Sequence, residues 1–122
     1  MKILMSIKPE YVEKIFSGEK KYELRRKIFI HRVKSIIIYS TYPVMKVVGE
    51  FEVKNIKIDS PSNIFNTYHN VICIDKEKFF KYFSNATKAY AIEIGQVFKY
   101  EEPKTLMSLG IKKAPQSYMY IR

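Results

Sequence analysis

Cysteine and histidine are scarce in this 122-residue chain, which contains one cysteine, Cys73, and two histidines, His31 and His69. A single cysteine excludes an intramolecular disulfide framework, as expected for a protein of a reducing compartment. It also excludes a cysteine-based zinc site, and the carboxylates lie scattered among lysines without the spacing of metal ligands. We therefore expect no metal, we expect Cys73 in the packed interior, and we expect both histidines in exposed loops.

Glycine and long apolar runs are also scarce. The four glycines are spread along the chain and form no phosphate-cradling loop. The N-terminus carries no apolar stretch of signal-peptide length, and no segment reaches the roughly 20 apolar residues of a membrane-spanning helix. These features predict a cytoplasmic protein that has no membrane partner and needs no cofactor.

Acidic residues are outnumbered, because 22 Lys and Arg stand against 12 Asp and Glu and give a formal net charge of +10. Such an excess is typical of proteins whose partner is a polyanion, most often nucleic acid. A lysine-rich surface that only keeps the protein in solution is the alternative. Hydrophobic residues make up 47% of the chain and aromatic residues 15%, so we expect residues 1–122 to form one packed domain.

The hydrophobic pattern predicts long strands and few helices. The predicted strands cover residues 1–7, 21–25, 35–42, 44–58, 88–100 and 118–121. A bulge is expected near Lys54 and Asn55, where the alternation changes parity. Helices are predicted to begin at Pro9, after Ser60 and after Asp75, and a capped turn is predicted over residues 105–110. These elements indicate an α+β domain built on a curved mixed sheet or a small barrel.

The string GEKKYELRR is the most informative part of the sequence. Glu23 is flanked at i−2 and i+2 by Lys21 and Arg25 on one strand face, with Lys20 and Arg26 nearby. A carboxylate among cations stays ionised and holds a guanidinium in place. Such a cluster could accept hydrogen bonds from a base edge while its cations bind a phosphate. A solvated strand face with weak ion pairs would explain the same pattern.

Two further motifs accompany this string. The pattern G-x-K-x-x-E-x-R, residues 18–25, follows SIKPEYVEKIFSG, residues 6–18, and PQSYMY, residues 115–120, comes near the end of the chain. Together these motifs closely resemble the ASCH domain family, a branch of the PUA-like superfamily, and particularly its small stand-alone microbial members. The likeness covers nearly the whole chain, and it implies a small, mixed PUA-like β-barrel with a few helices packed around it.

The resemblance also implies a cleft that is lined by the matching residues. Carried over position by position, the cleft residues are Lys8, Lys20, Glu23, Arg25, Ser40, Gln116 and Ser117. Arg26 joins them as a neighbouring cation. The superfamily mostly binds RNA, and some relatives hold a modified base in a pocket. RNA is therefore the expected partner, with DNA or a modified nucleotide as the alternative.

Some ASCH relatives are enzymes. The amidohydrolase branch, which removes the acetyl group from N4-acetylcytidine, looks like G-x-K-x-x-T-x-R, with the Thr, the Lys and a later Glu in its active site. Glu23 occupies the Thr position here, and residues 67–74, where the later Glu would be sought, contain no acid. That triad is therefore absent. Nuclease activity is also attributed to family members, and a metal-independent version would need acid–base groups such as Lys8, Lys20 or Glu23.

Two functions from different classes follow. The first, which we favour, is a nucleic-acid-binding module with a pocket for a base or nucleotide on the strand that carries Glu23. The second is a metal-independent hydrolase of a nucleoside or RNA, in which Lys20 and Glu23 form the acid–base pair. A regulatory domain that binds a protein is a third.

Four lysines could follow a phosphate backbone or simply form a solvated helix face. They are Lys76, Lys78, Lys81 and Lys88.

Overall fold

Strands dominate the computed structural model, which describes residues 1–121. Along the chain the elements are β1 (Lys2–Ile7), α1 (Pro9–Phe16), β2 (Tyr22–Arg25), β3 (Ser35–Ser40), β4 (Lys46–Asp59), α2 (Pro61–Tyr68), η1 (His69–Val71), α3 (Lys76–Tyr82), β5 (Ala89–Lys104), η2 (Met107–Leu109) and β6 (Tyr118–Ile121). Every strand and helix predicted from the sequence is present, and the differences lie at the ends of the elements.

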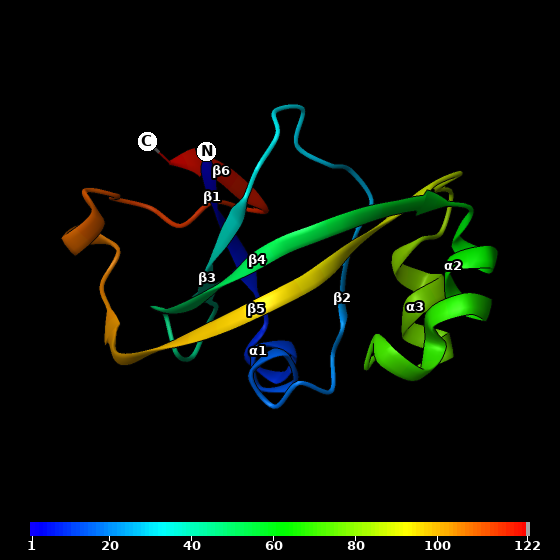
Figure 1. Ribbon diagram of the computed structural model, residues 1–122, viewed down its shortest axis with the longest axis horizontal. Coiled ribbons are helices and arrows are strands. Elements are labelled where there is room, and N and C mark those ends of the chain that lie inside the picture. The colour runs from blue at the N-terminus through cyan, green and yellow to red at the C-terminus, as the bar shows by residue number, and fades with distance from the viewer. Residues whose placement is uncertain (122) are drawn as a thin grey trace.

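The strands form one curled sheet in the order β2-β5-β4-β3-β1-β6. The pair β1–β3 is parallel, whereas the other neighbours are antiparallel, so the sheet is mixed. The long strands β4 and β5 form a twisted ribbon across the molecule, with α2 and α3 packed together at one end of it (Figure 1). The predicted α+β class and small, mixed, barrel-like sheet are therefore confirmed.

Local sequence signals set the helix boundaries as expected. The Ser60 side chain caps α2 by accepting a hydrogen bond from the backbone N–H of Asn63 at 3.2 Å. The Asp75 carboxylate caps α3 by accepting from the N–H of Lys78 at 2.8 Å. Gly18 follows α1 with φ at +83°, in the left-handed region where glycine is favoured.

The strand ends and bulges differ in part from the prediction. The expected bulge near Asn55 is confirmed, because the β4–β5 register shifts between Val53 and Asn55. Two further shifts in β4 lie nearer its start, and β5 continues to Lys104 because that residue still pairs with Val47. β3 ends at Ser40 because the chain turns over residues 41–44.

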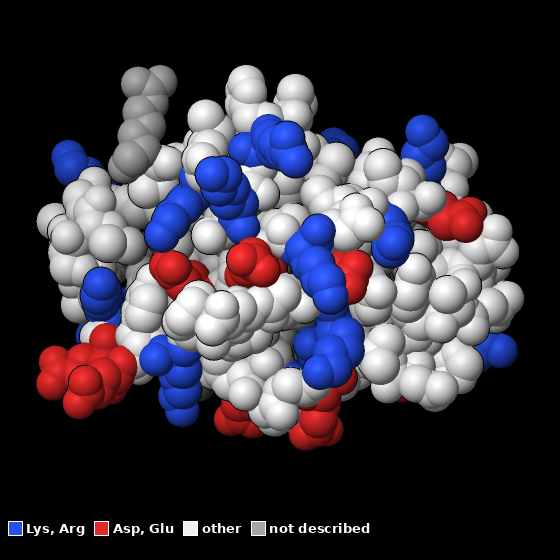
Figure 2. All heavy atoms as spheres, in the orientation of Figure 1, with Lys and Arg blue, Asp and Glu red and all other residues white. Residues whose placement is uncertain are grey.

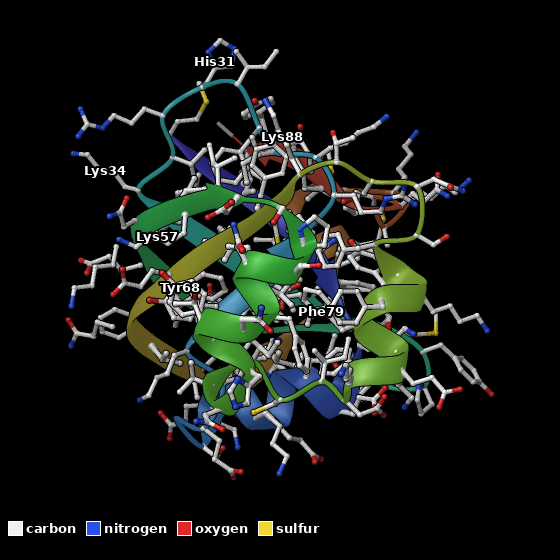
Figure 3. The ribbon with its side chains drawn as sticks, turned by 90° about the vertical axis from the view of Figure 1, so that its right-hand side faces the viewer. His31, Lys34, Lys57, Tyr68, Phe79 and Lys88 are labelled. Carbon is white, nitrogen blue, oxygen red and sulfur yellow. The ribbon has the colours of Figure 1, made fainter. Side chains whose placement is uncertain are left out.

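Two hydrophobic clusters flank the position of β2. One fills the curl of the sheet and includes buried residues of β1, α1 and β3 such as Met5, Ile15 and Ile38. The other lies under α2 and α3, where Phe79 points between the two helices (Figure 3), and includes Leu24 of β2. Consecutive residues of β2 alternate between two sides. Leu24 therefore packs toward the helices while Glu23 and Arg25 point into the opening of the curled sheet.

Acidic and basic side chains are interspersed on the face that carries β4 and β5 (Figure 2). Two ion pairs form across the ribbon and its neighbours, between Lys54 and Glu93 at 3.8 Å and between Lys2 and Glu50 at 3.4 Å. None of the helices over residues 1–121 is both long enough and apolar enough to cross a membrane.

Gly49 provides a test of how tightly α1 packs on the β4–β5 ribbon. A Cβ at this position would collide with the Phe98 carbonyl oxygen and would lie 2.8 Å from the ring of Phe16. We expect Gly49→Ala to lower the free energy of unfolding by about 3 kcal/mol, as overpacking does in a closed site. Urea denaturation followed by circular dichroism measures it. Gly110→Ala is the control, because its Cβ meets open space and costs only the left-handed φ of +73°. Equal losses in the two variants would contradict the packing.

Candidate nucleic-acid interface

A pocket of about 600 Å³ opens beside β2, between α1 and α3. We call it the inner pocket. Its lining residues are Ser6, Ile7, Lys8, Tyr11, Lys20, Glu23, Leu24, Arg25, Thr41, Ile74, Lys78, Lys81, Tyr82 and Gln116. Five of these side chains are cationic and one is a carboxylate. The pocket therefore carries a surplus of positive charge that favours an anionic ligand.

Glu23 is the single acid of this set, and it is buried, with 5% of its surface exposed. Its Oε2 accepts hydrogen bonds from both Nε (3.1 Å) and Nη2 (2.8 Å) of Arg25. Its Oε1 lies 3.9 Å from Lys20 Nζ, which is too far for a hydrogen bond. Within residues 1–121, Oε1 accepts no hydrogen bond from the protein, so this atom can accept one from a ligand.

Arg25 joins the two ends of the sheet. Nη2 donates to the Ser6 carbonyl in β1 at 2.9 Å, and Nη1 donates to Ser117 Oγ, just before β6, at 3.1 Å. Ser6 in turn donates its backbone N–H to the Ser117 carbonyl at 2.9 Å. β2 stands at one end of the strand order and the β1–β6 pair at the other. These bonds, which we call the Arg25 clasp, therefore span the opening of the curled sheet.

Lys20 is buried at the back of the inner pocket, with 3% of its surface exposed. Nζ donates to the Ile72 carbonyl at 2.6 Å and lies 5.0 Å from the centre of the Tyr11 ring. Burial lowers the pKa of Lys20, and the neighbouring Glu23 carboxylate opposes part of that shift. Burial also raises the pKa of Tyr11. The site thus holds a desolvated ammonium group that lines the pocket and a tyrosine that stays protonated.

The structure brings together most of the predicted site residues. Lys8, Lys20, Glu23, Arg25 and Gln116 all line the inner pocket. Ser40 is not among the residues that line it.

Arg26 and Ser117 lie outside the inner pocket. Both line an adjoining hollow of about 630 Å³, which we call the outer hollow. Ser40 is buried where β3 ends, and the next residue, Thr41, lines the inner pocket instead.

Sequence reasoning gave too little weight to α3. Lys78, Lys81 and Tyr82 line the inner pocket, whereas the sequence leaves Lys78 and Lys81 open between a phosphate contact and a solvated helix face and does not indicate Tyr82. Their spacing of i, i+3 and i+4 places them on one face of the helix, away from buried Phe79 and Phe83. This spacing was the available signal. Tyr11, from α1, was missed as well.

The cysteine and the histidines lie outside both cavities. Cys73, which we expected in the interior, is only partly buried and has a left-handed backbone with φ at +55°. This turn directs its neighbours Ile72 and Ile74 toward the core and the inner pocket. His31 is exposed in the loop before β3, as expected (Figure 3), whereas His69 is exposed but begins η1 and does not lie in a loop.

The curled mixed sheet and the pocket beside its second strand define a PUA-like domain of the ASCH type. The crystal structure of ASCH from Zymomonas mobilis superposes with a TM-score of 0.90 at 26% sequence identity, covering 99% of this chain and 87% of that one. The sequence model described as "Domain of unknown function (DUF365)" matches residues 1–114. The chain therefore belongs to the DUF365 family.

Two curated relatives carry names of their own. The ASCH domain-containing ribonuclease of Zymomonas mobilis subsp. mobilis is 29% identical over 89 residues, which are 72% of this chain and 60% of that protein. The ATP synthase subunit alpha of Ureaplasma parvum serovar 3 is 31% identical over 121 residues, which are 98% of this chain. This chain spans only 15% of that subunit. The likeness therefore concerns one part of a much longer protein.

Proposed function

We propose that this domain binds RNA and holds one nucleobase in the inner pocket. The observation that carries the proposal is a buried carboxylate fixed by an arginine inside a cavity that otherwise offers cations. A purely structural ion pair would not require three further lysines in the pocket, one at the start of α1 and two on α3, whereas a nucleotide presents both a base edge for Glu23 and phosphates for Lys8, Lys78 and Lys81.

Each polar group in the pocket suits one part of a nucleotide. Glu23 Oε1 accepts an exocyclic amine, and Lys20 donates to a base carbonyl. Gln116, which also lines the pocket, completes the reading of the base edge. Tyr82 offers an aromatic face on which a base can stack. Four of the five N–H groups of Arg25 are used within the protein, so Arg25 contributes one remaining Nη1 donor and mainly orients Glu23.

The size of the cavity and the relatives support the same function. A volume of about 600 Å³ lies within the range of small-molecule sites, roughly 300–1,000 Å³. A relative that covers 72% of this chain is named an ASCH domain-containing ribonuclease, which associates the fold with RNA. The test is direct binding of the purified protein to single-stranded RNA, structured RNA and duplex DNA at two salt concentrations. Absence of binding to every RNA at low salt would end the proposal.

Glu23→Gln tests the base pocket itself. The amide keeps the shape of the side chain but replaces a charged acceptor, so we expect discrimination among single-stranded homopolymers to fall about tenfold, since one good base-edge contact contributes about 1–3 kcal/mol. Competition between labelled and unlabelled homopolymers measures the ratio. Glu19→Gln is the matched control, because Glu19 pairs with Lys14 at the surface and lines neither cavity. Unchanged discrimination in a folded Glu23→Gln protein would show that Glu23 is structural only.

A hydrolase is the second candidate, and the buried Lys20 beside Glu23 favours it. In RNA cleavage the 2′-hydroxyl oxygen attacks phosphorus and the bond to the 5′-oxygen breaks. Glu23 would accept the hydroxyl proton, and Lys20 would donate a proton to the leaving oxygen. The discriminating result is cleavage of RNA in the presence of a chelator that disappears in Lys20→Ala. No cleavage of RNA or of a panel of acylated nucleosides by the wild-type protein removes this candidate.

A further inference from the structure

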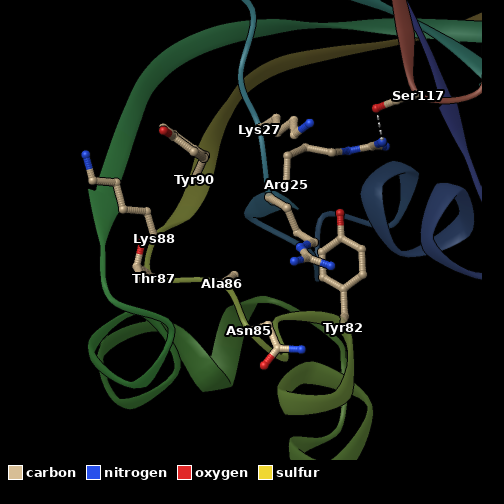
Figure 4. Close-up of a pocket in the computed structure, with 10 residues that line it drawn as sticks. Arg25, Lys27, Tyr82, Asn85, Ala86, Thr87, Lys88, Tyr90 and Ser117 are labelled. Atoms are coloured by element: carbon tan, nitrogen blue, oxygen red, sulfur yellow. Dashed lines mark hydrogen bonds between the residues drawn. The ribbon is translucent and has the colours of Figure 1, made fainter.

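The outer hollow adjoins the inner pocket and has a different character. It lies between β2, the end of α3 and the start of β5, and Figure 4 shows Lys27 and Lys88 on opposite sides of it. Four of its lining side chains are cationic, namely Arg25, Arg26, Lys27 and Lys88. No carboxylate is among the residues that line it. Like charges gathered without an acid repel one another, and an anion placed among them relieves that repulsion.

These cations are available to a ligand. Arg26, Lys27 and Lys88 are exposed, and within residues 1–121 none of them forms an ion pair. Arg26 donates only one weak bond, to the Ser84 carbonyl at 3.3 Å.

The distribution of charge over the chain points the same way. Eight of the 22 basic residues line one or both cavities, against one of the 12 acidic residues. The excess of positive charge is therefore concentrated at the two cavities.

The two cavities adjoin each other. Arg25 and Tyr82 line both of them, and Ser117, which receives the Nη1 bond of Arg25, lies on the outer side (Figure 4). Each cavity is large enough for one nucleotide. A free nucleoside or mononucleotide would fill the inner pocket and leave the outer hollow empty. A single-stranded nucleic acid with one base in the inner pocket would instead pass over Arg25, and its neighbouring phosphates would lie among the cations of the outer hollow.

We propose that the ligand of this domain is single-stranded RNA rather than a free nucleotide, with the phosphates that flank the pocketed base bound in the outer hollow by Arg26, Lys27 and Lys88. This inference rests on the proposed function, because it extends the same ligand beyond the inner pocket. The hydroxyl and amide groups of Thr87 and Asn85 line the hollow and can pair with a 2′-hydroxyl. Because only RNA carries a 2′-hydroxyl, these two side chains favour RNA over DNA as the single-stranded ligand.

The first arm of the test compares ligands on the wild-type protein. A fluorescently labelled, unstructured RNA of about ten nucleotides is titrated by anisotropy, and the four nucleoside monophosphates compete for it. We expect the strand to bind about 100-fold more tightly than the best monophosphate, because it occupies two linked sites. A monophosphate that binds as tightly as the strand overturns the inference while leaving the inner pocket intact. Single-stranded DNA of the same sequence that binds as tightly as RNA overturns the assignment to RNA.

The second arm compares two triple variants over a series of salt concentrations. In R26A/K27A/K88A we expect the magnitude of the log–log salt slope to fall by about 2, because each lost phosphate contact contributes about 0.7 on a single strand. The charge-matched control is R32A/K112A/K113A, whose three residues are exposed and line neither cavity. Its slope should stay within about 0.5 of the wild-type value.

Three comparisons keep the test decisive. The charge-conserving R26K/K27R/K88R should keep the wild-type slope, which shows that charge and not altered folding is measured. Equal slopes in the two alanine variants overturn the inference. If the wild-type protein binds neither the monophosphates nor RNA, the proposed function itself is overturned. This outcome differs from tight monophosphate binding and from equal salt slopes, which overturn only the further inference.

Discussion

Replacement of Arg25 by alanine is expected to lower the free energy of unfolding by about 4 kcal/mol. Glu23 would remain buried with its Oε2 unpaired, and breaking one side of a buried ion pair typically costs about 3–5 kcal/mol. The same change removes the bonds to Ser6 and Ser117, so the opening of the curled sheet loses its side-chain link. Urea denaturation followed by circular dichroism measures the loss.

A paired replacement separates stability from binding. In E23M/R25M neither buried charge remains, and apolar side chains of similar volume often replace such a pair at little or no cost. We expect this double variant to recover most of the lost stability and still not to discriminate among bases. A loss below about 1 kcal/mol in Arg25→Ala would contradict the prediction, since Glu23 would then be adequately solvated without its partner. A double variant that retains base discrimination would instead contradict the role of the pocket.

Much of the fold follows from signals that act over a few residues. The alternation in β2 placed Glu23 and Arg25 on one face, and the capping residues Ser60 and Asp75 fixed the starts of two helices. These features depend on neighbours along the chain, so the sequence contains what decides them. The change of parity at Asn55 belongs to the same class, because a bulge is visible as a slip in the hydrophobic pattern.

The parts of the site that escaped prediction depend on contacts between distant segments. Arg25 bonds to Ser117, 92 residues away. The ASCH resemblance placed both residues in one cleft, but no local pattern predicts the hydrogen bond that joins them. Ser40 is buried at the end of β3, and Thr41, in the turn that follows, lines the inner pocket instead, which depends on how this turn lies against the rest of the pocket.

The polar face of α3 shows a different limit. The positions of Phe79 and Phe83 reveal which face packs inward, and therefore which face bears Lys78 and Lys81. Whether that polar face meets only solvent or borders a cavity depends on where the helix lies against β2. The ASCH resemblance supplied the fold and the strand residues of the site, but the helical wall had to come from the structure.

The second large effect is expected at Lys20, where binding and stability should respond in different ways. Lys20→Met removes the buried ammonium from the inner pocket, and we expect RNA affinity to fall about 30-fold, as for a desolvated charge that contacts a ligand. The free energy of unfolding near neutral pH should change by less than about 1 kcal/mol. The unpaired Ile72 carbonyl costs stability, whereas removal of a desolvated charge restores it. Lys21→Met, at the adjacent exposed lysine, is the control and should affect neither quantity appreciably.

The pH dependence of stability provides an independent check on the same side chain. Burial lowers the pKa of Lys20 below its ordinary value of 10.5, so the unfolded chain holds this proton more tightly than the folded protein does. Unfolding stability of the wild-type protein relative to Lys20→Met should therefore rise as the pH increases from the lowered pKa toward 10.5. Burial also raises the pKa of Tyr22 and of Tyr100 to about 12, which destabilises both proteins equally above about pH 10 and cancels in the difference. Denaturant unfolding at a series of pH values measures that difference. A constant difference would contradict the desolvation of Lys20, and wild-type RNA affinity in Lys20→Met would exclude the inner pocket as the binding site.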